Sequence, residues 1–480
     1  MDKKTFTQGT LYQNSVVTQA GTTYRLARLA SGEKRLVVQG DTAVFGGDDS
    51  DEGLLCPLTP ANAAVLRSRL PWLNPVTLGH QSSFGFGDRL GSATPGHIQA
   101  LRATDPDGTI VPIFAQQSVR ENSRIGRTPQ QVIDDATWGV FQEGWRAPWG
   151  ADADHVKELA DLDDFVAAGY TFFTIDPSDH VDNAAQTDSL DTLRAKTTDL
   201  PWDNLQSSYS DMHDRYCRRP FVLDGLTLAF DQAVLRRALA KYGRALAHTI
   251  AIANELTAQI GAKPYDLEMS VDETDTPTSI YEHFFIVNEL TRVHVPVVSL
   301  APRFVGKFQK GVDYIGDLAA FERELACHVA IMRHFDSYKL SIHTGSDKFS
   351  IYPIIARQAQ GRVHVKTAGT SYLEALRVMA AQDPVFFRRI LALARARFEK
   401  DRKTYFLDAE LSQVPENSSL ADSDLPALLE HFDTRQVLHV TFGSILDEFR
   451  AAFHEFIDRH EADYRATLEA HFIRHLAPFA

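Results

Sequence analysis

The chain has 480 residues, of which 44% are hydrophobic and 23% charged, a composition that is typical of globular proteins and excludes disordered and fibrous ones. Its 63 acidic and 49 basic side chains give a formal net charge of −14. Such a surface repels phosphate backbones and anionic membranes, so we expect neither nucleic acid nor a membrane as a partner. An anionic substrate therefore needs a local basic pocket.

Cysteine spacing and the lack of long apolar runs indicate the compartment. Cys56, Cys217 and Cys327 lie far apart, without a CxxC motif or a zinc-type spacing, which favours a reducing environment over a disulfide framework. The first residues contain no apolar signal core, and no apolar run reaches the roughly eighteen residues of a membrane span. We expect a cytoplasmic protein.

The first seventy residues differ in pattern from the rest. Short alternating stretches such as TYRLARL and KRLVVQ, with a break at Gly46-Gly47, predict a small antiparallel β-rich appendage over residues 1–70. The remainder, 71–480, is predicted to form the catalytic domain.

From about residue 75, short strand-like runs alternate with longer helical segments, the pattern of βα repeats and a parallel sheet. Because eight parallel strands close a barrel, we predict an α/β fold of the (β/α)8 TIM-barrel type. A doubly wound open sheet ranks second, since no GxGxxG motif opens a helix after a strand. The eight predicted strands are Val76–His80, Val111–Gln116, Thr171–Asp176, Asp266–Val271, Val297–Pro302, Lys339–Thr344, Val363–Ala368 and Val437–Phe442.

The segments between these runs have helical spacing of apolar residues, and several begin with a capping residue. A polar stretch near 182–220 predicts an insertion over the barrel mouth, and extra helices are expected near 381–435. The predicted helices are Pro129–Gly144, Asp224–Ile260, Thr278–Val293, Asp317–Phe335 and Ser371–Gln382.

Polar residues recur with period two within the predicted strands. In the run DLEMSV, Asp266, Glu268 and Ser270 share one face, opposite three apolar residues. Burying one unpaired ionised group costs several kcal/mol, so such groups must satisfy one another, a metal or a ligand inside the barrel. The same split occurs at Thr174/Asp176, Ser299/Arg303, Ser341/His343, His364/Lys366 and His439/Thr441.

Barrel enzymes place their active sites at the carboxyl ends of the strands. The candidates there are Asp176, Glu268, Arg303, His343 and Lys366, with His364 one layer deeper. A lone strand histidine is more often a core residue, and a lone strand acid often pairs with an arginine. Several histidines clustered with carboxylates favour a metal site instead.

Three loops add candidates, each with a simpler alternative. In DPSDH, Asp176 and His180 could share one ion, or the segment could be a capped turn. The glycine-rich stretch Ser82–Gly91 could hold a carboxylate or a phosphate through Arg89 and backbone N–H groups, or be a flexible loop. The run GADADHVK supplies His155 as a reserve ligand, or caps a helix.

Between about Gln81 and Glu374 the chain contains several long motifs in order. They are SFGFGDRLGSATPGH, QQSVRENSRIGRTPQQV, GADADHVK, TFFTIDPSDHV, DLEMSVDET, VSLAPRFVGKFQKGVDY, KLSIHTGSDKFSIYP and HVKTAGTSYLEAL. Together these motifs resemble those of the tagaturonate epimerase family of hexuronate catabolism. The resemblance implies a metal-dependent epimerase that converts tagaturonate, a small keto-uronate, to fructuronate.

The two keto acids differ at C4, which is β to the C2 ketone, so simple enolisation cannot invert it. Deprotonating the C4 hydroxyl and cleaving C3–C4 gives an enediolate and an aldehyde, and re-addition to the rotated aldehyde inverts C4. This route needs a proton carrier and an electrophile such as a divalent ion. A metal-dependent aldolase and a non-catalytic sugar-acid-binding barrel are the alternatives.

The predicted roles follow from strand geometry and this chemistry. Asp176, Glu268 or His155 could replace one of the predicted histidine ligands, and the ligand types accept Mn, Zn, Ni or Fe. The sequence does not determine the oligomeric state. The assignments are metal ligands His180, His343 and His364, catalytic residues Asp176 and Glu268, and substrate-binding residues Arg89, Arg303, Lys348 and Lys366.

Overall fold

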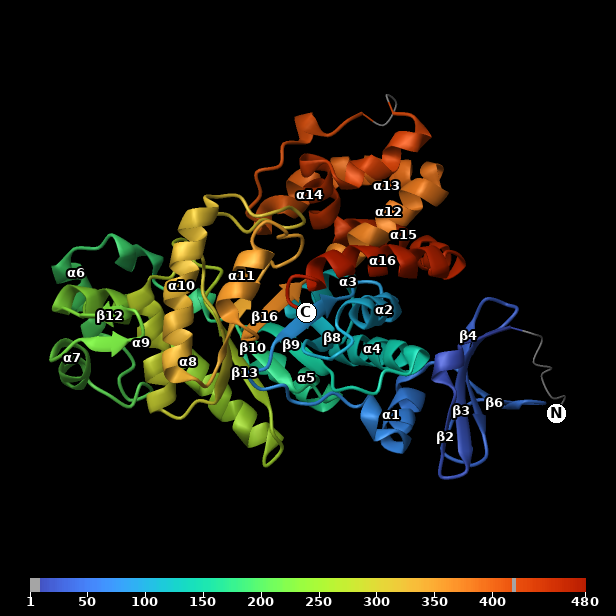
Figure 1. Ribbon diagram of the computed structural model, residues 1–480, viewed down its shortest axis with the longest axis horizontal. Coiled ribbons are helices and arrows are strands. Elements are labelled where there is room, and N and C mark those ends of the chain that lie inside the picture. Colours follow the sequence, from blue (N-terminus) through green and yellow to red (C-terminus); the bar gives the residue numbers. More distant parts are fainter. Residues whose placement is uncertain (1–8, 417–419) are drawn as a thin grey trace.

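A closed barrel of eight parallel strands forms the centre of the molecule (Figure 1). The computed structural model describes residues 9–416 and 420–480. Around the barrel the strands follow the order β10-β13-β14-β15-β16-β7-β8-β9, so the chain order closes on itself as in a (β/α)8 barrel. The strands are β7 (Ser83–Gly87), β8 (Val111–Ser118), β9 (Gly150–Val156), β10 (Phe172–Ile175), β13 (Asp266–Ser270), β14 (Val297–Ala301), β15 (Lys339–Ile342) and β16 (Val363–Thr367).

Six of the eight predicted strands are confirmed, and two are wrong. Val76–His80 is irregular chain that crosses the barrel floor, where the N–H groups of Leu78 and Gly79 donate to the Asp266 carboxylate. Val437–Phe442 ends helix α14 (Phe432–Val440) and begins α15 (Phe442–Arg459). A short apolar run fits a buried helix as well as a strand, which is why periodicity failed here.

The barrel instead uses two segments that the sequence reading assigned to a loop and a helix cap. The glycine-rich loop is largely strand β7: a Cβ at Gly85 would collide with the Gln116 side chain, and one at Gly87 would lie 2.6 Å from the Ala368 carbonyl oxygen. The glycines therefore allow close strand approach rather than flexibility. The run GADADHV is β9, whose alanines are fully buried while Asp152 and Asp154 contact Lys366 inside the barrel.

Helices surround the barrel, and the five predicted ones are present with shifted ends. Capping boxes start α4 at Thr128 and α9 at Ser279, as their sequences favour. The principal outer helices are α2 (Thr94–Thr104), α4 (Pro129–Glu143), α5 (Leu162–Ala168), α8 (Gln232–Ile260), α9 (Ile280–Arg292), α10 (Leu318–Phe335), α11 (Tyr352–Ala359) and α12 (Thr370–Gln382).

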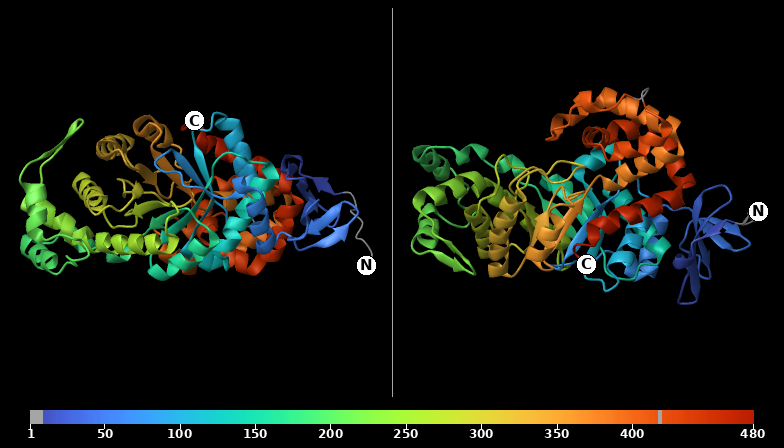
Figure 2. Two further views of the ribbon diagram at one scale, coloured as in Figure 1. Left: turned by 90° about the horizontal axis from the view of Figure 1, so that it is seen from below. Right: turned by 45° about the horizontal axis from the view of Figure 1, so that its top comes forward.

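Residues 10–56 form the predicted antiparallel β-rich unit, a six-stranded sheet at one end of the elongated molecule (Figures 1 and 2). Its contact with the C-terminal helix α16 (Glu461–Leu476) centres on Glu461. That carboxylate accepts from Tyr12 Oη at 2.6 Å, Arg28 Nη2 at 2.8 Å and Lys34 Nζ at 2.7 Å. The first and last parts of the chain are thereby joined. The strands are β1 (Thr10–Leu11), β2 (Val17–Gln19), β3 (Thr22–Arg28), β4 (Lys34–Gln39), β5 (Asp48–Ser50) and β6 (Gly53–Cys56).

The polar segment near 182–220 lies at the opposite end of the molecule. Its helices α6 (Leu190–Thr198) and α7 (Tyr209–Cys217) pack on the long helix α8 (Figure 1). It contributes no residue to the wall of the pocket described below, but Asn183 Oδ1 accepts from the backbone N–H of Asp275, which belongs to that wall, at 3.1 Å.

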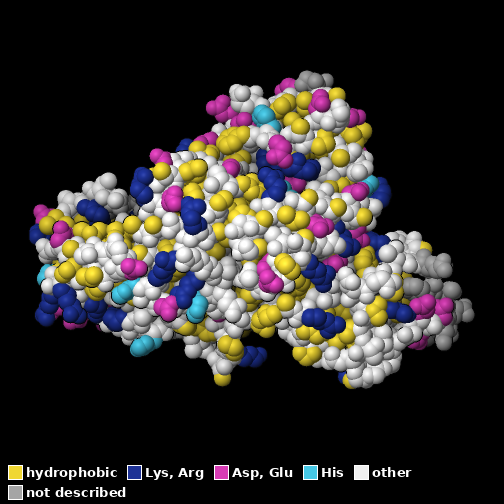
Figure 3. Space-filling model, viewed as in Figure 1, with side chains coloured by type: hydrophobic (Ala, Val, Ile, Leu, Met, Phe, Trp, Pro, Cys, Tyr) yellow, Lys and Arg dark blue, Asp and Glu magenta, His cyan; other side chains and the backbone are white. Residues whose placement is uncertain are grey.

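The C-terminal helices form a layer on another side of the barrel, where α13 (Pro384–Asp401) lies beside α14 and α15 (Figures 1 and 2). No helix in the described part of the chain is long and apolar enough to cross a membrane. On the face drawn in Figure 3, acidic and basic side chains are interspersed, so the net negative charge is not gathered into one patch there.

Candidate active site

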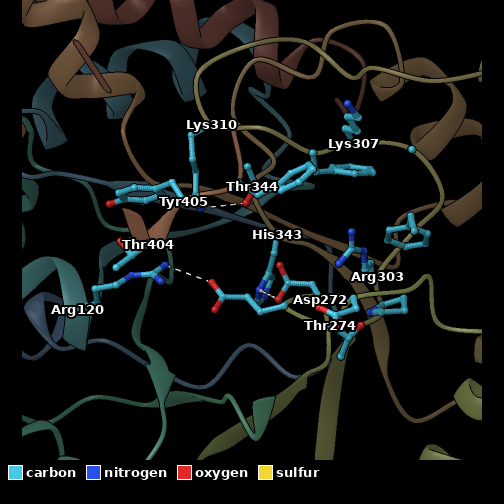
Figure 4. Close-up of a pocket in the computed structure, with 17 residues that line it drawn as sticks. Arg120, Asp272, Thr274, Arg303, Lys307, Lys310, His343, Thr344, Thr404 and Tyr405 are labelled. Atoms are coloured by element: carbon cyan, nitrogen blue, oxygen red, sulfur yellow. Dashed lines mark hydrogen bonds and ion pairs between the residues drawn. The ribbon is translucent and has the colours of Figure 1, made fainter. Parts of the chain in front are cut away.

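A cavity of about 470 Å³ opens where the barrel strands end. Its walls carry His343 and Thr344 directly after β15, Arg303 shortly after β14, and Asp272 and Glu273 shortly after β13 (Figure 4). This is the end of the barrel at which (β/α)8 enzymes build their active sites. The loop 302–310 and the segment 404–406 complete the walls.

One cluster at this end brings together three side chains that could hold a metal ion. His155, Asp272 and His343 each offer one ligand atom, and the three atoms lie within 4.8 Å of one another. Asp272 Oδ1 lies 3.0 Å from His343 Nδ1 and 4.0 Å from His155 Nε2. The three residues come from the ends of β9, β13 and β15, so the cluster depends on barrel closure.

His155 reaches the cluster because β9 is irregular at its end. The register with β10 shifts between Phe173 and Ile175, where one extra residue enters β9. His155 also has a left-handed backbone with φ of 55°, which is uncommon for a residue other than glycine. A bulge of this kind re-aims side chains near active sites, and here both Asp154 and His155 contact the site.

Each imidazole of the cluster donates its second N–H to a buried carboxylate. His155 Nδ1 lies 2.9 Å from Asp154 Oδ1, and His343 Nε2 lies 2.6 Å from Glu268 Oε1. Ser299 Oγ donates to the other oxygen of Glu268 at 2.5 Å. Carboxylates placed behind ligand histidines select the tautomer and fix the ring orientation.

The charged groups of this cluster shift one another's pKa values. Burial opposes protonation of His343, but Asp272 and Glu268 outweigh burial and raise the pKa of the imidazole to about 10. Burial also opposes ionisation of Glu268, yet Lys366 and His343 hold its pKa well below the usual value. A divalent cation would replace the positive charge that protons otherwise supply here.

The residues present therefore fit a divalent first-row ion. Two imidazoles and one carboxylate form a ligand set that such ions accept, and Asp272 and His343 also line the cavity, which leaves positions for a substrate. A second cluster, Asp347 with His471 and His475, does not fit. Arg435 lies 3.0 Å from the Asp347 carboxylate, and the backbone N–H of Asp347 donates to His475 Nε2.

His155, Asp272 and His343 are called the ion-ligand cluster below. Of the three predicted histidine ligands, only His343 belongs to it. His180 stacks on His248, with ring centroids 4.0 Å apart. His364 is fully buried in a deeper layer, 2.9 Å from Ser83 Oγ. His155, the reserve ligand, and Asp272 complete the cluster in their place.

The two predicted catalytic acids lie outside the cavity wall. Glu268 is fully buried behind His343. Asp176 is also buried, where one oxygen accepts from Ser178 N–H and the other lies 3.7 Å from Lys157 Nζ. Neither lines the cavity.

Among the four basic residues predicted to bind substrate, only Arg303 lines the cavity. Lys366 is buried below it among carboxylates. The guanidinium of Arg89 is buried between Glu121 and the Phe442 ring. The Lys348 ammonium donates to three backbone carbonyls, and burial lowers its pKa to about 7. Lys348 therefore holds loops together.

Sequence reasoning missed several residues of the cavity wall. Asp272 and Glu273 directly follow a predicted strand, a position that could have identified them. Arg120 comes shortly after β8 in the same way. Lys310 and Tyr405 lie far from any strand end, so only the tertiary fold brings them to the cavity.

The closed barrel and the polar cavity at its strand ends define a (β/α)8-barrel enzyme. A model of the family described as tagaturonate epimerase matches residues 12–479. The chain belongs to the tagaturonate epimerase family and is a carbohydrate epimerase, an isomerase, which confirms the resemblance seen in its sequence motifs.

Individual relatives agree along nearly the whole chain. The tagaturonate/fructuronate epimerase of Thermotoga maritima is 43% identical over 455 residues, covering 91% of this chain and 92% of the relative. The native crystal structure of the fructuronate-tagaturonate epimerase of Cohnella laeviribosi is 38% identical with a TM-score of 0.93, covering 98% of this chain and 96% of that one. A glycerol-complexed structure of the same protein has a TM-score of 0.92 at the same identity and coverage.

Proposed function

We propose that this chain interconverts D-tagaturonate and D-fructuronate by inversion at C4, through cleavage and re-formation of the C3–C4 bond. The observation that carries the proposal is one cavity that combines an ion-ligand cluster with two basic side chains that, among the described residues, have no carboxylate within 4.0 Å. Those side chains are Arg303 and Lys310.

The four basic residues of the cavity wall differ in their partners. Arg120 lies 3.2 Å from Glu273, and Lys307 lies 2.8 Å from Asp408. Within the described part of the chain, Arg303 and Lys310 have no carboxylate within 4.0 Å, and Lys310 Nζ donates to Thr344 Oγ1 at 3.0 Å. Basic side chains without a paired carboxylate favour binding of an anionic substrate. We assign them to the C6 carboxylate and the hydroxyls.

His155, Asp272 and His343 would hold the divalent ion. When bound, the ion would act as a Lewis acid that stabilises negative charge on the C2 and C3 oxygens of the substrate. This chain's own side chains supply proton transfer and the retention of the cleaved fragment.

Glu273 is the proposed proton carrier for the C4 hydroxyl. Its carboxylate lines the cavity, with Oε1 3.2 Å from Arg120 Nη2 and 4.0 Å from His155 Nε2. Glu268, predicted for this role from the sequence, is assigned to orienting His343 because it is sealed from the cavity. A carboxylate must reach the proton that it accepts.

Cleavage of C3–C4 leaves an aldehyde fragment that carries C4, C5 and the C6 carboxylate. Rotation about C4–C5 presents the opposite face of the aldehyde, and re-addition then inverts C4. Cations that hold the carboxylate keep this fragment in the cavity during rotation. Retention separates an epimerase from an aldolase, which releases both fragments.

Incubating the metal-stripped chain with tagaturonate, with and without Mn²⁺, Zn²⁺ or Ni²⁺, tests the proposal. We expect fructuronate only when an ion is added. In D₂O, the product should keep hydrogen at C4, because the route never breaks the C4–H bond. Full activity of the stripped chain would refute the ion requirement, deuterium at C4 would refute the cleavage route, and accumulation of free fragments would indicate an aldolase.

A further inference from the structure

We propose that Lys366 is a positioning residue that orients both ligand imidazoles at once through their carboxylate partners. The inference rests on the proposed ion site. Lys366 belongs to β16, and its ammonium lies in the barrel interior beneath the cavity, without lining it. This positioning role takes the place of the substrate-binding role that the sequence predicts for Lys366.

The argument begins with which oxygen atoms the ammonium contacts. Lys366 Nζ lies 2.8 Å from Asp154 Oδ1 and 3.1 Å from Glu268 Oε1. These are the two atoms that accept the N–H groups of His155 and His343, at 2.9 Å and 2.6 Å. One cation therefore contacts both acceptors, and moving it would displace both imidazoles.

The ammonium is itself held in one place. Asp152 Oδ2 lies 2.7 Å from Nζ, Thr174 Oγ1 accepts from it at 2.5 Å, and Thr174 Oγ1 in turn lies 2.9 Å from Asp152 Oδ1. Only 3% of the Lys366 side chain is exposed. An ammonium among three carboxylates in a rigid interior is a fixed point charge rather than a mobile one.

This placement matters for ion affinity because the imidazole-bound carboxylates are buried and need a counter-charge. Without Lys366, the Asp154 and Glu268 carboxylates would lose the ammonium that both contact and would be free to rotate away, and each imidazole would lose its oriented acceptor. Loss of such partners behind ligand histidines lowers metal affinity about 10–100-fold.

A matched control is available in the neighbouring strand β15. Lys339 is also fully buried inside the barrel, but its ammonium donates to the Gln81 carbonyl and to Ser83 Oγ, each at 2.8 Å. It has no ion pair with Asp154 or Glu268 in the described part of the chain. Lys339→Met therefore reports the general effect of removing a buried lysine.

The experiment measures Co²⁺ affinity and the visible absorption spectrum of the Co²⁺ complex for the metal-stripped full chain. We expect Lys366→Met to bind Co²⁺ about 10–100-fold more weakly than the parent and to change the spectrum, while Lys339→Met keeps both. Lys366→Gln, which keeps a donor without the charge, should fall between parent and Lys366→Met and serves if Lys366→Met does not fold.

The outcomes separate the two proposals. If the folded Lys366 variants match Lys339→Met in affinity and spectrum, the positioning role is overturned while the ion site stands. If the parent itself binds no Co²⁺, the proposed ion site fails first. If Asp154→Asn and Glu268→Gln leave affinity unchanged, the inference also falls, because Lys366 acts through those two carboxylates.

Discussion

Removing the charge of Lys310 should make the enzyme lose its preference for uronates over neutral ketohexoses. The Nζ atom faces the cavity, has one neutral partner in Thr344, and has no carboxylate within 4.0 Å in the described part of the chain. In the Lys310→Met variant, the substrate carboxylate loses one of two proposed cationic partners. A neutral sugar has no carboxylate to lose contact with.

The magnitude follows from distance and screening. Two unit charges about 4 Å apart at an effective dielectric constant of about 20 attract by about 4 kcal/mol. Because the cavity is open to solvent and Arg303 remains, we expect the variant to lose about 1.5–3 kcal/mol of this interaction energy. That loss corresponds to a decrease of roughly 10–150-fold in kcat/KM for tagaturonate. For tagatose, we expect a change of less than about threefold.

The assay compares initial rates of C4 epimerisation of tagaturonate and tagatose by chromatography of the products. Lys307→Met is the matched control, since Lys307 belongs to the same loop but is exposed and paired with Asp408 at 2.8 Å. An equal loss of kcat/KM on both sugars would refute the assignment, because it would place Lys310 in the chemical step or in the fold rather than in recognition of the carboxylate.

Three further outcomes are expected. His155→Ala should lower the amount of bound metal per chain while the fold is retained, whereas His180→Ala should leave the metal content unchanged. Elemental analysis of both variants measures this, and equal metal content in the two would exclude His155 as a ligand. Glu273→Gln should lower turnover by a factor on the order of 10²–10⁴ with the metal content unchanged. Near-normal rates would show that another group transfers the proton. Glu461→Gln should destabilise the chain by about 1–3 kcal/mol at pH 7 in thermal unfolding. Although burial favours its neutral form, Lys34 and Tyr12 lower the pKa of Glu461 to about 2. The stabilisation from the ionised carboxylate is therefore complete above pH 4.5 and is lost as the pH falls towards 2. If the difference in stability between the parent and Glu461→Gln does not narrow in acid, this linkage is contradicted.

The barrel class and part of the site could be predicted from local sequence patterns. In β13, the alternation of Asp266, Glu268 and Ser270 with apolar residues fits a strand with a polar inward face, and all five residues of the strand are buried. His343 could be identified as a candidate ligand because it follows a clear apolar strand directly. Period-two alternation and strand ends are local properties, so the sequence carries them.

Tertiary structure alone decided which of the candidates meet. His155 joins His343 only because a bulge adds one residue to β9 and the closed barrel turns the ends of β9 and β15 toward one interior, an arrangement that local pattern does not specify. Lys310 reaches the cavity from a loop that has no periodicity to read. The sequence determined which side chains could bear charge inside a barrel, and the long-range register between strands and loops decided which of those charges share a site, because the contacts that set it join residues far apart in the chain.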